Sequence, residues 1–86
     1  MSDKLIALNS MEVTDYSSDG FEMEYVLADN TQENIKVLTD AGFTREEIES
    51  ATDETDIDLC VLAFEHADAQ WWEPGRGFFR EVSHAG

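Results

Sequence analysis

Hydrophobic and polar residues alternate between residues 21 and 28, and this period of two predicts a β-strand. The two alternating sets are Phe21, Met23, Tyr25 and Leu27, and Glu22, Glu24, Val26 and Ala28. Side chains two positions apart share one face of a strand. The first set is therefore predicted to face a core, and the glutamates are predicted to face water.

The residues before this strand predict its hairpin partner. Residues 15–20, Asp-Tyr-Ser-Ser-Asp-Gly, are turn formers of the kind that join antiparallel strands. Residues 5–14 precede this turn and are predicted to form the other strand. Together these segments predict a β-hairpin over about residues 5–28.

The hydrophobic period then changes, and two short helices are predicted over about residues 31–41 and 44–51. Residues 30–33, Asn-Thr-Gln-Glu, fit a capping box, and Gly42 is placed to end the first helix. The second helix opens on Thr-Arg-Glu-Glu, which is another capping box, and apolar residues on both sides of it fit a hydrophobic staple.

A third and longest helix is predicted over about residues 56–72. Apolar side chains recur there every three or four positions from Ile57 to Trp71. The run at 57–64 could also form a buried strand, but the helical period continues beyond it and favours the helix. In the aromatic and glycine-rich segment 73–86, residues 78–82 either add a strand to the hairpin or stay irregular.

These elements predict an α+β fold with one domain over residues 1–86. An N-terminal antiparallel hairpin or small sheet is expected to pack against three helices. A chain of 86 residues has no room for a second domain and buries a modest core. A deep catalytic cleft is therefore not expected.

Charge is the most unusual property of the composition. Twenty acidic residues stand against five Lys and Arg, which gives a formal net charge of −15. This excess disfavours direct binding to nucleic acid or to an anionic membrane, and it favours basic partners. With 42% hydrophobic residues and one proline, the chain is expected to fold rather than to be disordered.

The cellular compartment is predicted from what the sequence lacks. Cys60 is the single cysteine, so no disulfide framework is possible within the chain. The first residues do not resemble a secretory leader, and no apolar run approaches the ~20 residues that span a bilayer. A cytosolic protein is expected.

The densest acidic segment runs from residue 46 to residue 58 and has no base within it. Its acids are Glu46, Glu47, Glu49, Asp53, Glu54, Asp56 and Asp58. If wholly helical, the segment would extend about 20 Å with one charge per ~3 Å, close to the charge spacing of a DNA strand. Helped by Glu22 and Glu24, it is predicted to occupy a groove that binds nucleic acid. A plain solvated helical face is the alternative.

Aromatic and basic residues gather between residues 71 and 80. Tryptophan and arginine are favoured anchors at protein interfaces, so Trp72 and Arg76 are predicted to contact a partner. Trp71 and its neighbour lie about 100° apart on a helix, so one of the two rings is expected to face solvent. The alternative is that these rings cap a small core while the arginines pair with acids.

Residues 33–66 resemble a ubiquitin-associated domain. The sequence Ala41-Gly42-Phe43-Thr44 is similar to the end of that family's first helix and the loop after it. The resemblance implies a three-helix protein-binding module in which Gly42 and Phe43 form the contact loop. Ala41 departs from the family pattern, which usually has methionine there, and the hairpin is left unexplained.

No enzymatic constellation is found. His66 and His84 lack ligand spacing, the serines lack a nucleophile motif, and the acidic segment lacks the glycine of a calcium loop. Neither a metal nor a cofactor is expected.

The sequence thus predicts a small acidic inhibitor that mimics the charge of nucleic acid and blocks a basic nucleic-acid-binding protein. The analogy is to phage proteins that act against CRISPR or restriction enzymes, in the cytosol of the host cell. An adaptor module that binds through its aromatic residues is one alternative. An acidic globular protein whose charge only maintains solubility is the other.

Overall fold

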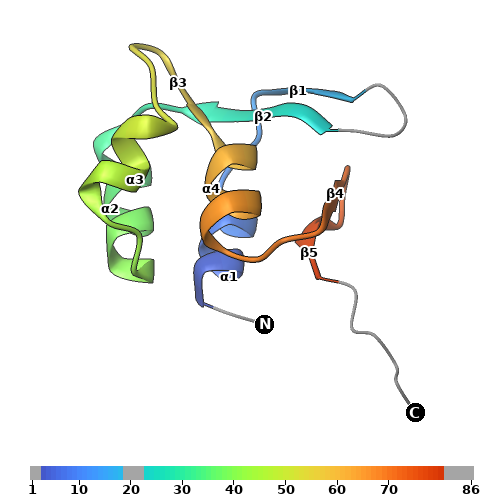
Figure 1. Cartoon of the computed structure of the whole chain (residues 1–86). Coiled ribbons are helices and arrows are strands. Elements are labelled where there is room, and N and C mark those ends of the chain that lie inside the picture. Colours follow the sequence, from blue (N-terminus) through green and yellow to red (C-terminus); the bar gives the residue numbers. More distant parts are fainter. Residues whose placement is uncertain (1–2, 19–22, 81–86) are drawn as a thin grey trace.

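The computed structural model describes residues 3–18 and 23–80, and its elements confirm the predicted α+β class (Figure 1). These residues form four helices: α1 (Asp3–Ser10), α2 (Gln32–Ala41), α3 (Arg45–Ser50) and α4 (Leu59–His66). They also form five strands: β1 (Asp15–Ser18), β2 (Met23–Asp29), β3 (Asp56–Asp58), β4 (Trp71–Glu73) and β5 (Gly77–Phe79). No helix of the described residues has the length and hydrophobicity needed to cross a membrane.

The strands form an antiparallel three-stranded sheet, in the order β1-β2-β3, and a separate β4–β5 hairpin. The free edge of β3 is bordered by the chain before it, where the Asp58 N–H donates to the Ala51 carbonyl at 2.7 Å. In Figure 1 the sheet crosses the top of the molecule, and the helices lie below it. The sheet therefore has an inner face, which the helices cover, and an outer face that no helix of residues 3–18 and 23–80 covers.

The prediction of which side of β2 faces the core was wrong. Val26, Ala28 and the β3 residue Ile57 are 0% exposed, whereas Tyr25 and Leu27 are only partly buried. Residues 25–28 are all apolar, so alternation cannot choose between the two faces there; the register with β3 and the packing of α4 decide it. Glu24 is exposed as predicted, while Phe21 and Glu22 lie outside the described residues.

The hairpin exists, but its first strand does not lie where it was predicted. Residues 3–10 form α1 in place of the strand over residues 5–14, and they bury Leu5 and Leu8 at helical spacing. The predicted turn at 15–20 contributes β1, which pairs with β2 through Tyr16 and Val26. A fourth helix therefore joins the three that were expected.

The two capped helices are confirmed. Thr31 caps α2, one residue later than predicted, and its hydroxyl accepts a hydrogen bond from the Asn34 N–H at 3.1 Å. Gly42 ends this helix with a φ of 109°, in the left-handed region that favours glycine. The predicted capping box of Thr44 and Glu47 starts α3.

The predicted long helix over residues 56–72 was wrong. Its first residues form β3, in which Ile57 pairs with Ala28, and only Leu59–His66 is helical. Asp58 caps α4 by accepting a hydrogen bond from the Cys60 N–H at 3.0 Å. Strand pairing thus overrides the helical period of the sequence, and the apolar run at 57–64 is neither all strand nor all helix.

The C-terminal hairpin is joined to α1 through Asn9. The Asn9 amide donates to the Phe78 carbonyl at 2.9 Å, and the Phe78 N–H donates to the Asn9 side-chain oxygen at 2.6 Å. A Cβ atom on Gly77 would lie 2.5 Å from that same oxygen, so the close approach requires glycine here. These contacts bury the Phe78 ring in the core, between the helices and the hairpin.

Candidate protein-binding surface

The acidic segment 46–58 is not a single helix. It passes from α3 through a turn into β3. The row of charges expected for a wholly helical segment therefore does not form. Its carboxylates divide instead into those that support the fold and those that face solvent.

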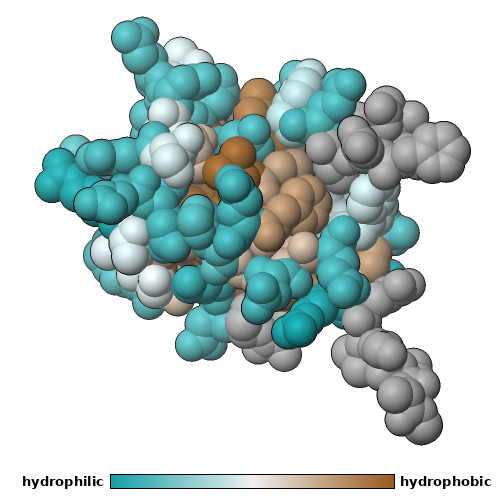
Figure 2. Space-filling model, viewed as in Figure 1, coloured by the Kyte–Doolittle hydropathy of each residue, from teal (hydrophilic) through white to brown (hydrophobic). Residues whose placement is uncertain are grey.

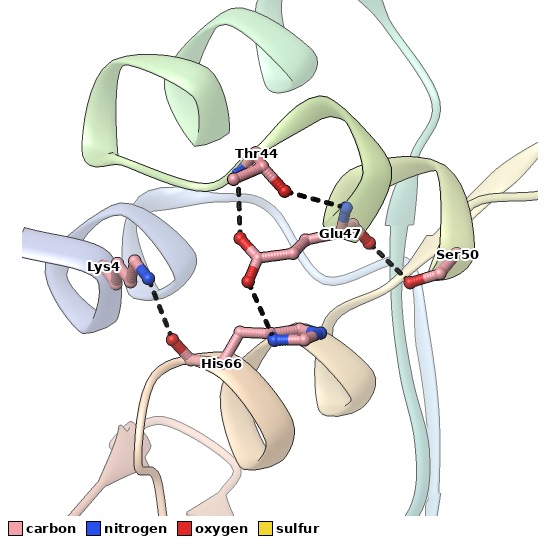
Figure 3. Close-up of polar contacts among 5 residues, drawn as sticks. All are labelled: Lys4, Thr44, Glu47, Ser50 and His66. Carbon is pink, nitrogen blue, oxygen red and sulfur yellow. Dashed lines mark hydrogen bonds and ion pairs between the residues drawn. The ribbon is translucent and has the colours of Figure 1, made fainter.

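Glu47 supports the fold (Figure 3). Its carboxylate accepts a hydrogen bond from the Thr44 N–H at 2.8 Å and lies 2.9 Å from Nδ1 of His66 on α4. Lys4 of α1 donates to the His66 carbonyl at 3.1 Å and so meets the same junction. The Thr44 hydrogen bond, with the charges of His66 and Lys4, holds the pKa of Glu47 below 4.5. Glu47 therefore ties α3 to α4 and is not free for a partner.

Asp53 and Asp58 also have structural roles. The Asp53 carboxylate accepts hydrogen bonds from the N–H groups of Thr55 and Asp56, at 2.9 and 2.7 Å, and these bonds lower its pKa. Asp58 caps α4 and is partly buried. Burial raises the pKa of Asp58 above 3.8, although its backbone hydrogen bonds oppose the shift.

Of the other carboxylates in the segment, Glu46, Glu49 and Glu54 are exposed, and Asp56 is partly buried. Glu49 pairs with Arg45 at 3.0 Å on the exposed side of α3, and Asp56 accepts the Thr55 hydroxyl at 2.7 Å. Glu46 and Glu54 are exposed, and their carboxylates make no hydrogen bond or ion pair with another described residue.

The register of the sheet brings together carboxylates that are distant in the sequence. Asp15 and Asp58 both lie opposite Leu27, and Asp29 lies opposite Asp56. Residues that are opposite each other on neighbouring antiparallel strands point to the same side. The outer face therefore carries Asp15, Asp29, Asp56 and Asp58 around the partly exposed Tyr25 and Leu27; we call these six residues the acidic face. Sequence reasoning missed Asp15 and Asp29, because only the strand register shows that they join the group.

The basic residues do not neutralise this surface. Lys36, Arg45 and Arg76 each pair with an acid three or four residues away, at 3.0, 3.0 and 3.9 Å. Lys4 lies over the Phe43 ring, 5.1 Å from its centroid. Within residues 3–18 and 23–80, no Lys or Arg forms an ion pair with a carboxylate of the acidic face.

A shallow hollow of about 250 Å³ borders the acidic face. Leu27, Asp56 and Asp58 line it together with Val61 of α4. Figure 2 shows apolar residues gathered in the region of α4 and surrounded by hydrophilic ones. Val61 and Phe64 are the partly exposed apolar residues of that helix. Apolar and acidic surfaces thus adjoin at this edge of the sheet.

The remaining predicted contact residues lie elsewhere. Trp72 is 6% exposed and packs in the core, while Trp71 is partly exposed. Arg76 is exposed, with its guanidinium 3.6 Å from the centroid of the Phe79 ring. The Glu24 carboxylate accepts the Ser17 hydroxyl at 3.0 Å at the exposed edge of the sheet.

The contact loop implied by the resemblance to ubiquitin-associated domains is not available. Phe43 is 3% exposed and lies beneath Lys4. In addition, β3 separates α3 from α4, and α4 packs against β2 rather than completing a three-helix module.

Residues suited to metal or thiol chemistry do not form a site in the described chain. No three His, Cys, Asp or Glu side chains of residues 3–18 and 23–80 are grouped closely enough to hold a metal ion. Burial and the neighbouring Asp58 raise the pKa of the Cys60 thiol to about 12, which suppresses the reactive thiolate.

Comparison with protein families, with curated proteins and with solved structures finds no significant match to this chain.

Proposed function

We propose that this protein binds a Lys- and Arg-rich surface of a nucleic-acid-binding protein through its acidic face and blocks nucleic acid from that surface. The proposal includes no catalysis and places the protein in the cytosol, as for phage inhibitors of CRISPR or restriction enzymes. The observation that carries it is the array of four carboxylates on three neighbouring strands, with no Lys or Arg paired to them among the described residues.

This arrangement of charges is unfavourable for the isolated fold. Like charges directly opposite each other on neighbouring strands, such as Asp29 and Asp56, cost about 0.2–1 kcal/mol. Solubility alone would be served equally well by carboxylates placed apart on helix surfaces. An array that carries a local penalty is more simply explained by a partner that supplies the missing positive charge.

The acidic face can bind basic side chains in two ways. Its carboxylates can accept paired hydrogen bonds from guanidinium groups, as phosphates do. The apolar stems of Lys and Arg can lie over Leu27 and Tyr25, while their charged ends reach the surrounding aspartates. Long-range attraction between a net charge of −15 and a basic groove would also speed association at low salt.

The test is a direct competition experiment. Proteins captured from host lysate by the immobilised chain at low salt are identified, and the captured nucleic-acid-binding protein is purified for binding measurements. The triple variant Asp29→Asn, Glu54→Gln, Asp56→Asn removes charge at and beside the acidic face. The matched control Asp3→Asn, Glu33→Gln, Glu65→Gln removes the same charge from exposed helical positions.

We expect the first variant to weaken binding by at least tenfold, or about 1.4 kcal/mol, and to flatten its salt dependence. The control should change affinity by much less, and DNA or RNA should displace the wild-type chain. Equal losses in both variants would show that only net charge matters. A salt-resistant complex that nucleic acid does not displace would contradict the proposal.

A further inference from the structure

A groove lies between β1 and the turn of the C-terminal hairpin, and Asp15 is the one residue that it shares with the acidic face. Its volume is about 320 Å³, and Val13, Tyr16, Trp72 and Pro74 line it. Figure 1 shows the β4–β5 hairpin below the β1 end of the sheet, on the side where the helices lie. The groove is thus formed by segments that are more than fifty residues apart in the sequence.

The aromatic side chains that line the groove pack on one another and on a buried ring. Tyr16 is 46% exposed, and its ring centroid lies 4.7 Å from that of Trp72, at an interplanar angle of 53°. Trp72 rests on the buried Phe78 ring at 6.3 Å, and Asn9 fixes the backbone of that residue through two hydrogen bonds. An exposed tyrosine on such a base loses little conformational freedom when a ligand packs against it.

The groove also offers polar groups for a ligand. No described residue accepts a hydrogen bond from the Trp72 indole N–H, and no side-chain nitrogen or oxygen in the described chain is both buried and without a partner. The indole N–H is therefore not fully buried. Asp15 is the one charged residue among the described groove residues, so the groove favours a cationic ligand.

We infer that this groove binds a short proline-rich segment of a partner protein that carries Lys or Arg beside its prolines. Proline-rich chains adopt the polyproline II conformation and dock into grooves lined by aromatic rings. Their conformation is largely set before binding, which suits a groove at the small end of the range for ligand sites. Asp15 selects the basic residue.

The test uses NMR with a panel of labelled peptides that combine Pro-x-x-Pro with flanking arginine. The two indole N–H signals serve as internal probes, because Trp72 lines the groove and Trp71 does not. A saturable shift of the Trp72 signal, with little change at Trp71, is expected for at least one basic proline-rich peptide. Tyr16→Ala should weaken that binding about tenfold, and Asp15→Asn a few-fold. The control Ile6→Ala, which truncates the other large exposed apolar side chain among the described residues, should leave it unchanged.

Three outcomes would overturn the inference. One is that no peptide of the panel shifts the Trp72 signal. Another is that arginine peptides without proline bind equally well, because charge alone would then explain the contact. The third is that Tyr16→Phe, which keeps the ring and the fold, binds as weakly as Tyr16→Ala. Neutralising Asp29, Glu54 and Asp56 should not affect peptide binding, so this inference and the acidic-face proposal can fail separately.

Discussion

The two faces of the three-stranded sheet are built by opposite rules. On the inner face, Val26, Ala28 and Ile57 are completely buried and apolar. On the outer face, partly exposed Tyr25 and Leu27 lie among four aspartates from β1, β2 and β3. The same three strands therefore supply both the centre of the core and the most concentrated unpaired charge of the described sheet.

This difference separates residues whose contribution to stability explains their presence from residues whose presence it does not explain. Burial of apolar area accounts for Val26, Ala28 and Ile57 on the inner face. The outer face combines partly exposed apolar side chains, which add little to stability, with like charges, which reduce it. Such a surface is typical of a binding site, and five measurements can break or sharpen the contrast.

The largest expected effect concerns the reactivity of the Cys60 thiol. Cys60 is buried and lies in the first turn of α4. With a thiol pKa of about 12 and 5% exposure, it should react with a thiol reagent at neutral pH at least about a thousandfold more slowly than a free cysteine. The reaction is followed by absorbance, with urea-unfolded protein as the reference. Rapid reaction of the folded protein would show that the inner layer opens readily.

The next effect contrasts the two faces directly. Ile57→Ala should lower the free energy of unfolding by about 2–5 kcal/mol, because it leaves a cavity in the core. Leu27→Ala should lower it by only about 1 kcal/mol, because Leu27 is partly exposed. Urea denaturation measures both. Similar losses for the two variants would mean that the outer face is as buried as the inner one.

An intermediate effect is expected at Asp58, which lies on the outer face but caps α4. Asp58→Ala removes the cap and should cost about 1 kcal/mol. Asp58→Asn keeps an oxygen for the Cys60 N–H and removes a partly buried charge, so it should be at least as stable as wild type at neutral pH.

The pH dependence at this residue provides a check. Burial raises the pKa of Asp58 in the folded state, so the folded protein binds this proton at higher pH than the unfolded chain does. Its destabilising contribution is present at neutral pH and fades as the pH falls through the folded pKa. Glu47 has a lowered pKa and should show the opposite sign, since its stabilising contribution is lost on acidification. Denaturation of Asp58→Asn and Glu47→Gln against wild type, from neutral pH to about pH 3, measures both signs.

The smallest effect is expected for Asp29 and Asp56. Removing one charge of this pair, by Asp29→Asn or Asp56→Asn, should stabilise the chain by a few tenths of a kcal/mol at low salt. The gain should shrink at high salt as screening weakens the repulsion. A double-mutant cycle measures the interaction free energy between the two residues. A favourable interaction between Asp29 and Asp56 would contradict the proposed penalty.

The parts of the fold that could be predicted are those whose signals are local. Thr44 and Glu47 form their capping box within one turn, and Gly42 ends α2 through its own backbone conformation. The failed predictions concern segments whose state depends on distant partners. Residues 56–58 have helical periodicity but pair with β2. Residues 5–10 are predicted to belong to a strand but form a helix, in which Leu5 and Leu8 are buried.

The acidic face and the aromatic groove could be predicted even less. A sequence shows that Glu47 and Asp56 are acidic, but not that Glu47 also meets His66 of α4 while Asp56 joins the outer face of the sheet. The same holds for the aromatic residues, because Tyr16 belongs to a segment that reads as a turn and Trp72 to one that reads as a helix. Their contact exists only when β1 and the hairpin come together.

The sequence by itself determined the net charge, the α+β class and the two capped helices, because composition is additive and caps act between neighbouring residues. The tertiary structure decided which face of β2 is buried, where the long helical pattern breaks, and which carboxylates stand together unpaired. These features depend on strand register and on contacts between distant segments. In a small domain, the free energy of those contacts exceeds the weak local preferences of the residues that make them.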